Sequence, residues 1–236
     1  MIVYKKPDIF KNGLTMLIFA LLILEIVAVI ISFDFVQFSF RPVVVVLILY
    51  LYWHTSKERK TLFFMTYLTL LITSICILFK DQYIFTIGLV SIAIHRILII
   101  YFLIKLNKIR DCAPVLIAIV PFISLFSYLL SIADEIPDVS FYPLVLQNIL
   151  VSIFAGIVLS NHFMNQNNKT VWLSIFGLLS TALYFIVFIE KCFLSNLPPT
   201  YFRPLGMILF AATYCAFYKS VIDIELEDAH SKAVRD

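Results

Sequence analysis

Two adjacent side chains that can carry charge and transfer protons lie inside one long apolar stretch. The segment Tyr83–Lys105, YIFTIGLVSIAIHRILIIYFLIK, holds His95 and Arg96 among aliphatic and aromatic residues. An arginine at the centre of a membrane-spanning helix costs about 2.5 to 3.5 kcal/mol on insertion scales, so such residues usually face the interior of a helix bundle and mark a site. An imidazole titrates near neutral pH and is a common proton shuttle. These two residues are therefore the first candidates for function.

A third charge, Glu25, lies near the middle of another apolar stretch, Leu14–Phe33. With a rise of about 1.5 Å per residue, Glu25 lies about 18 Å above the inner end of its helix, and Arg96 lies about 14 Å above the inner end of its own. The difference in depth is within the reach of the two side chains. An ion pair between them would lower the cost of burying either charge. The alternative is a purely structural pair, or an arginine whose head group extends to the inner lipid head groups.

His95 lies about 100° from Arg96 around a helix, so the two side chains point in different directions. We expect one of them to line a cavity while the other packs. A single histidine on a spanning helix is also a common hydrogen-bonded packing residue, and the sequence leaves that interpretation open.

Several polar residues lie in the predicted outer half of other apolar segments. They can form a second polar pocket, or they can join neighbouring helices by hydrogen bonds. The residues are Gln147, Asn148, Tyr142, Tyr214, Arg203 and Glu190. The four cysteines stand singly, without a CxxC spacing or a nearby histidine pair, so the sequence predicts neither a metal site nor a disulfide framework. No phosphate-binding loop or dinucleotide fingerprint is present, and we expect no cofactor.

The composition identifies an integral membrane protein. Hydrophobic residues make up 62% of the 236 residues and charged residues 14%, against about 45 to 50% and about 25% in soluble domains. The lysines and arginines form short clusters between apolar segments, which is typical of membrane topology signals and not of nucleic-acid binding. Almost nothing is left for a soluble domain, so we predict one membrane domain over residues 1–236.

The apolar segments predict an all-α, polytopic bundle of about eight transmembrane helices. The expected spans are residues 14–33, 38–53, 61–79, 83–104, 113–133, 141–160, 170–189 and 203–218. We expect Pro42 in the first turn of the second span, where a missing N–H costs nothing, and a kink near Pro121 in the fifth. The final stretch, Ile224–Asp236, is predicted to be a frayed charged tail.

Positive charge sets the orientation, because lysine and arginine are enriched in cytoplasmic connections. With both termini inside, four of these residues lie in outer connections, namely Arg41, Lys80, Lys191 and Arg203. The inner connections hold Lys5, Lys6, Lys11, Lys57, Arg59, Lys60, Lys105, Lys108, Arg110, Lys169, Lys219, Lys232 and Arg235. The asymmetry predicts cytoplasmic termini. We expect a multi-pass membrane protein, located in a bacterial inner membrane.

Two short motifs carry a resemblance to a known family. Phe85, Gly88, Leu89 and His95 in FTIGLVSIAIH are similar to its F-x-x-G-L and following A-H, and ATYCAFYKSVI in the last span is similar to its A-T-Y-x-x-A ending. With the helix count and the length, the chain resembles a divergent member of the YhhN family, eight-helix membrane proteins that include the lysoplasmalogenases.

The resemblance implies hydrolysis of the vinyl ether bond of a lysoplasmalogen, or of a related lysolipid, and a membrane lipid as partner. Such a bond breaks when a general acid protonates the vinyl carbon and water adds to the oxocarbenium ion, which a carboxylate stabilises. The candidate catalytic residues are His95, Glu25 and Glu190. The candidate substrate-binding residues are Arg96, Gln147, Asn148, Tyr214 and Arg203.

The chain lacks two acidic residues that are typical of the family. Members carry an acid in the third helix and another in the seventh, whereas Thr61–Phe79 and Thr170–Ile189 contain none. The sequence therefore leaves two alternatives to an enzyme open. One is a non-catalytic lipid-binding protein of the same fold. The other is a small transporter with Glu25, His95 and Arg96 on a proton path. The oligomeric state is not determined by the sequence.

Overall fold

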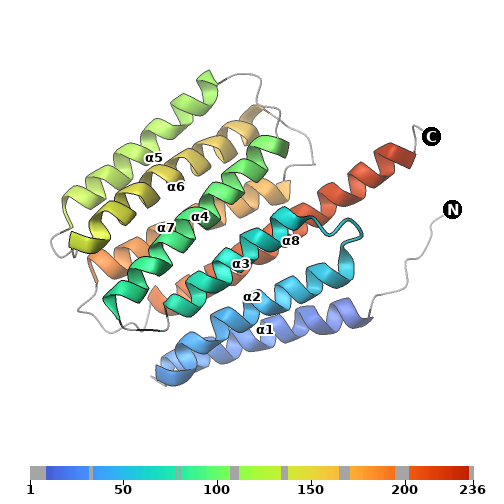
Figure 1. Ribbon diagram of the computed structural model, residues 1–236, viewed down its shortest axis with the longest axis horizontal. Coiled ribbons are helices and arrows are strands. Elements are labelled where there is room, and N and C mark those ends of the chain that lie inside the picture. The colour runs from blue at the N-terminus through green and yellow to red at the C-terminus, as the bar shows by residue number, and fades with distance from the viewer. Residues whose placement is uncertain are drawn as a thin grey trace.

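The computed structural model describes residues 9–31, 34–77, 79, 81–106, 112–133, 138–164, 171–194 and 202–233. Within these ranges the chain forms eight helices and no strand. They are α1 (Ile9–Ile30), α2 (Asp34–Thr55), α3 (Thr61–Cys76), α4 (Gln82–Leu106), α5 (Ala113–Ser131), α6 (Asp138–Met164), α7 (Val171–Cys192) and α8 (Phe202–Ala233). The helices run roughly alongside one another, with α1 and α2 at one edge of the bundle and α5 at the other (Figure 1).

Length and composition make five of these helices suitable for crossing a membrane. The apolar stretches are Tyr83–Lys105, Ala113–Ser131, Phe141–Met164, Val171–Glu190 and Phe202–Leu226, in α4 to α8. Two shorter apolar helices, Phe40–Thr55 and Thr61–Cys76, belong to α2 and α3. In its described part the chain is thus all-helical and of the multi-pass membrane class.

Each predicted span coincides with one helix to within a few residues, but two expectations were wrong. Helix α8 does not end at Tyr218: it continues through the charged residues to Ala233. Helix α2 begins at Asp34, so Pro42 lies in its interior and not in its first turn. A proline inside a helix removes one backbone hydrogen bond, which neighbouring helices in a membrane bundle can compensate. Residues 32–33, Leu78, Thr170 and 234–236, which belong to predicted segments, lie outside the described residues.

Helices α3 and α4 are direct neighbours. The hydroxyl groups of α3 donate to carbonyl groups of their own helix, at Thr66, Thr69, Thr73 and Ser74. The hydrogen bond between the two helices has its donor on α4: the Ser91 hydroxyl donates to the carbonyl oxygen of Thr69 at 2.9 Å. Asp81 starts α4 by accepting the backbone N–H groups of Tyr83 and Ile84 at 2.9 and 3.1 Å.

Gly156 allows α6 to approach α5 closely. A Cβ atom placed there would lie 2.4 Å from Cγ1 of Ile119 and 3.0 Å from its backbone nitrogen. No side chain fits that space, so the glycine is a requirement of the α5–α6 contact. Helix α5 is continuous through Pro121, and the kink there stays a prediction.

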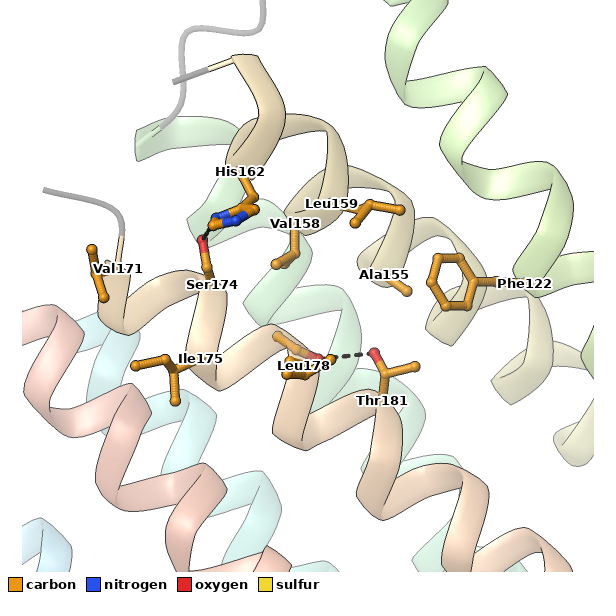
Figure 2. Close-up of a pocket in the computed structure, with 11 residues that line it drawn as sticks. Phe122, Ala155, Val158, Leu159, His162, Val171, Ser174, Ile175, Leu178 and Thr181 are labelled. Carbon is orange, nitrogen blue, oxygen red and sulfur yellow. Dashed lines mark hydrogen bonds between the residues drawn. The ribbon is translucent and has the colours of Figure 1, made fainter. Parts of the chain in front are cut away.

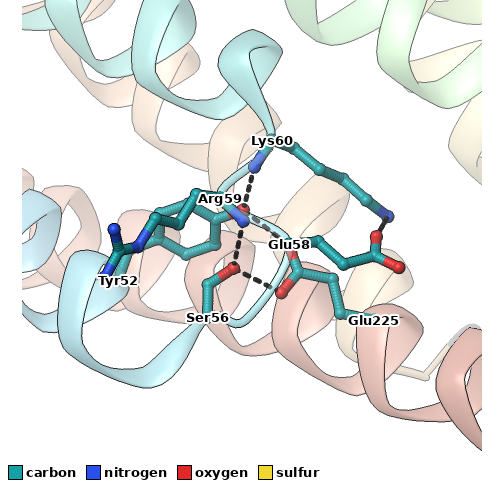
Figure 3. A network of polar contacts seen from close by, with 6 residues as sticks. All are labelled: Tyr52, Ser56, Glu58, Arg59, Lys60 and Glu225. Atoms are coloured by element: carbon teal, nitrogen blue, oxygen red, sulfur yellow. Dashed lines mark hydrogen bonds and ion pairs between the residues drawn. The ribbon is translucent and has the colours of Figure 1, made fainter.

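The C-terminal part of α8 is held by a buried carboxylate (Figure 3). Glu225 is 6% exposed; its Oε1 accepts the Tyr52 hydroxyl at 2.5 Å and its Oε2 accepts the Ser56 hydroxyl at 2.6 Å. The same two hydroxyl oxygens accept the backbone N–H groups of Lys60 and Arg59, at 3.0 and 2.9 Å. The carboxylate thereby fastens α8 to the turn between α2 and α3, which explains why the helix continues past Tyr218.

Replacing Glu225 by alanine should lower the free energy of unfolding by about 2 to 4 kcal/mol, because two hydroxyl donors lose a charged acceptor in a buried setting. The measurement is thermal unfolding of the purified protein in a neutral detergent. Asp223→Ala is the matched control on the same helix. Asp223 makes an ion pair of 3.4 Å with Lys219, and its side chain is 37% exposed, so a change below about 0.5 kcal/mol is expected. Equal effects of the two substitutions would contradict the role of Glu225.

Candidate functional site

The candidate site is a cavity of about 100 Å³ in the middle of the bundle. Helices α2, α3, α4, α6, α7 and α8 contribute to its wall. Its polar lining residues are Arg41, Thr73, Ser74, His95, Arg96, Ser180, Tyr184 and Tyr214. The remaining lining is aliphatic or aromatic and supplies most of the wall, so the cavity is a mainly apolar space into which a few polar side chains converge.

His95 is buried, at 2% exposure, and both of its ring nitrogens have partners. Nδ1 lies 2.8 Å from the carbonyl oxygen of Thr66, and Nε2 lies 3.2 Å from the hydroxyl oxygen of Tyr214. A carbonyl oxygen only accepts, so in the neutral ring the proton belongs on Nδ1. Nε2 then accepts the hydroxyl proton of Tyr214. Two residues that the sequence proposed separately, His95 and Tyr214, are thus brought together.

Arg96 is 8% exposed and points toward α7. Its guanidinium carbon lies 4.9 Å from the ring centroid of Tyr184, which is a cation–π contact. Its Nε has no hydrogen-bond partner, and no carboxylate of the described residues pairs with it. The expectation that only one of His95 and Arg96 lines a cavity was wrong. The cavity extends between α3, α7 and α8, so side chains that leave α4 in different directions both reach it.

Gln147 and Asn148 join α6 to its neighbours and do not line the cavity. The Gln147 amide donates to the carbonyl oxygen of Leu89 in α4 at 3.1 Å, and its Oε1 has no partner within the described part of the chain. The Asn148 amide donates to the carbonyl oxygen of Phe126 in α5 at 3.3 Å. Its Oδ1 accepts the Tyr184 hydroxyl at 2.5 Å. Asn148 therefore acts on the cavity indirectly, by positioning the ring that faces Arg96.

The other residues proposed for an outer pocket are not gathered in one place. Arg203 Nε lies 3.3 Å from Glu190 Oε1, an ion pair between α7 and α8. Neither residue lines the cavity, and Tyr142 is 80% exposed. The six residues thus divide between the central cavity, contacts that join helices, and the surface.

Glu25 belongs to α1, but its side chain lies outside the described residues. Helix α1 packs on α2 and α8, whereas α4 packs on α3 and α6. The pairing of Glu25 with Arg96 therefore stays a prediction.

Five polar lining residues were not among the site candidates drawn from the sequence, namely Arg41, Thr73, Ser74, Ser180 and Tyr184. Arg41 was assigned to an outer connection, but α2 begins earlier than expected and carries Arg41 in the wall of the cavity. Tyr184 and Ser180 lie on α7, where single hydroxyl groups in an apolar helix give no signal of their own. Arg41 could have been identified if the sequence around Pro42 had been interpreted as the interior of a helix.

A larger, apolar groove of about 390 Å³ lies between α5, α6 and α7 (Figure 2). Side chains such as Phe122, Val158 and Leu178 line it. At one end the hydroxyl of Ser174 lies 3.3 Å from Nδ1 of His162. The groove offers space for hydrocarbon but little polar chemistry, so the central cavity is the stronger candidate.

No protein-family model, curated protein or solved structure matches this chain. Within the described residues no group of three or more histidine, cysteine, aspartate or glutamate side chains is placed to hold a metal ion. The functional argument therefore depends on the geometry of the cavity.

Replacing Tyr214 by phenylalanine should lower the free energy of unfolding by about 1 to 3 kcal/mol, because Nε2 of the buried His95 loses its donor. Thermal unfolding in detergent measures the effect. Tyr142→Phe is the control, since that hydroxyl belongs to a side chain at the surface, and it should leave stability unchanged. A destabilisation by the control as large as that by Tyr214→Phe would show that the His95 contact is not the cause.

Proposed function

We propose that this chain is a bacterial inner-membrane protein that crosses the bilayer eight times, with both termini in the cytoplasm. Support for the crossings and their orientation comes from the distribution of lysine and arginine between the connections, and from five described helices of spanning length. The shorter apolar parts of α2 and α3 would span with their flanking turns, and α1 would supply the first crossing.

Reporter fusions test this topology. Fusions after Lys60, Arg110, Lys169 and Asp236 should report a cytoplasmic location, and fusions near Asp81 and Glu135 should report an external one. The physical reason is that clusters of positive charge are retained on the cytoplasmic side during insertion. A reversed location at two or more of these points would contradict the eight-span topology.

We further propose that the central cavity binds the polar head group of a membrane lysolipid. The observation that supports this most directly is the cavity itself, in which several polar side chains converge and the buried cation of Arg96 forms part of the wall. Such an arrangement costs stability unless something polar occupies it. Ligand-binding cavities between helices of a bundle commonly have this combination of apolar walls and a few convergent polar groups.

Hydrolysis of a vinyl ether, as in the YhhN-type lysoplasmalogenases that the chain resembles, is the second candidate. The hydrogen-bonded pair of His95 and Tyr214 in the cavity favours it. The geometry supports binding better, because the proton on Nδ1 of His95 is directed at the Thr66 carbonyl and not into the cavity. Glu190, a candidate acid, is engaged with Arg203. A general acid would then have to be Glu25.

A panel of lysolipids that includes a lysoplasmalogen distinguishes the two candidates. For the purified protein we expect thermal stabilisation by lysolipids and little or no release of fatty aldehyde. Any release should be abolished by His95→Ala or Glu25→Gln and kept by His162→Ala, a control histidine that lies in the apolar groove. Absence of stabilisation by every lysolipid would contradict binding. Strong release that survives both substitutions would place the active site elsewhere in the bundle.

A further inference from the structure

We propose that the central cavity is an oxyanion site, in which the guanidinium of Arg96 binds the phosphate or carboxylate of the ligand. This inference rests on the proposed function, because it specifies the chemistry of the head group. An arginine stays protonated in proteins, and a buried cation without a counter-charge is strongly destabilising. Arg96 is more than nine-tenths buried, and no carboxylate of the described residues pairs with it.

The charge of the cavity wall points to an anion. A second guanidinium, that of Arg41, also lines the cavity, and the described lining contains no aspartate or glutamate. A cationic or neutral ligand would leave Arg96 without a counter-charge among the described residues. An oxyanion would supply that counter-charge and would also accept several N–H groups of an arginine at once.

The hydrogen-bond donors of the wall support the same conclusion. Most of the polar side chains have already given their proton to a protein acceptor. Thr73 and Ser74 donate to carbonyls of α3, Tyr184 donates to Asn148, and Tyr214 donates to His95 in the neutral tautomer. The guanidinium of Arg96 is different, because its buried Nε has no acceptor. A ligand that satisfies this site must therefore bring acceptor oxygens.

The guanidinium is also held in place for such a ligand. The Tyr184 ring lies 4.9 Å from its central carbon, and Asn148 fixes the Tyr184 hydroxyl. The cavity of about 100 Å³ has room for a few water molecules, each of which takes about 30 Å³ in the liquid. That space suits a head group of a few heavy atoms and is too small for an acyl chain, so the hydrocarbon of an amphiphile must stay outside the cavity.

Two amphiphiles that differ only in the oxyanion test the inference. The full-length protein in a neutral detergent is titrated with a lysophosphatidate and with the monoacylglycerol of the same chain, and thermal unfolding is followed. We expect the lysophosphatidate to bind about tenfold more tightly or better, since hydrogen bonds to charged groups are the strong ones. Arg96→Gln should abolish this preference, Arg96→Lys should retain part of it, and the exposed control Arg59→Gln should retain all of it.

A ligand-free measurement separates this role from a structural one. Without ligand, Arg96→Gln should leave the melting temperature unchanged or raise it, because the substitution removes an unpaired buried charge. If an anionic ligand, and not Glu25, is the counter-charge of Arg96, then Glu25→Gln and Arg96→Gln should have additive effects in a double-mutant cycle. Strong coupling would identify Glu25 as the counter-ion of Arg96 and would overturn the inference.

The outcomes also distinguish a soluble anion from a lipid head group, and failure of the oxyanion site from failure of the proposed lysolipid binding. Stabilisation by inorganic phosphate alone that is lost in Arg96→Gln would support the oxyanion site with a soluble anion as its ligand. Equal affinity for the two amphiphiles, unchanged by Arg96→Gln, would overturn the oxyanion site and leave amphiphile binding intact. If neither amphiphile nor phosphate stabilises the protein, the proposed function and this inference both fail.

Discussion

Hydrogen bonds from buried side chains to the backbone carbonyls of neighbouring helices hold this bundle in one arrangement. Lipid tails are as apolar as the helices, so hydrophobic burial does little to choose helix neighbours within a membrane, and polar contacts and close packing matter more. Five donors of this kind join α3 to α4 and α8, and α6 to α4 and α5: His95 to Thr66, Ser91 to Thr69, Tyr67 to Tyr214, Gln147 to Leu89, and Asn148 to Phe126. Four of these five helices, α5 excepted, contribute to the wall of the central cavity.

Two buried charges show how differently the structure treats ionic groups. Glu225 receives two hydroxyl donors and so becomes a fastening between α8 and the turn that precedes α3. Arg96 has an aromatic ring beside it but an Nε without an acceptor, in a wall that holds another guanidinium. Buried polar groups without a hydrogen-bond partner are expected mainly at functional sites. The free energy lost by burying such a group is regained when a ligand binds to it. This contrast is why the binding proposal is built on Arg96.

The tautomer of His95 decides between binding and acid catalysis in the same cavity. Its position next to Tyr214 looks suited to proton transfer, and a sequence that places a histidine in a spanning helix invites that interpretation. The carbonyl oxygen of Thr66 argues against that interpretation. It accepts a hydrogen bond from Nδ1–H of the neutral ring, so Nε2 carries no proton and is an acceptor. In that form the pair of His95 and Tyr214 is a structural junction of α3, α4 and α8, and the hydrogen-bonding capacity left for a ligand lies on Arg96.

The sequence by itself determined the helical class, the approximate helix limits and the importance of His95 and Arg96, because apolar segment length and an intramembrane charge are local properties. Only the tertiary structure decided the position of Arg41 in the cavity wall and the continuation of α8 to Ala233. Charged residues such as Glu225 predict an exposed tail until their partners are known, and Tyr52 and Ser56 lie 173 and 169 positions away in the chain. Which carbonyls accept the side chains of Gln147 and Asn148 depends equally on which helices are neighbours, and that choice is made by packing of the whole bundle.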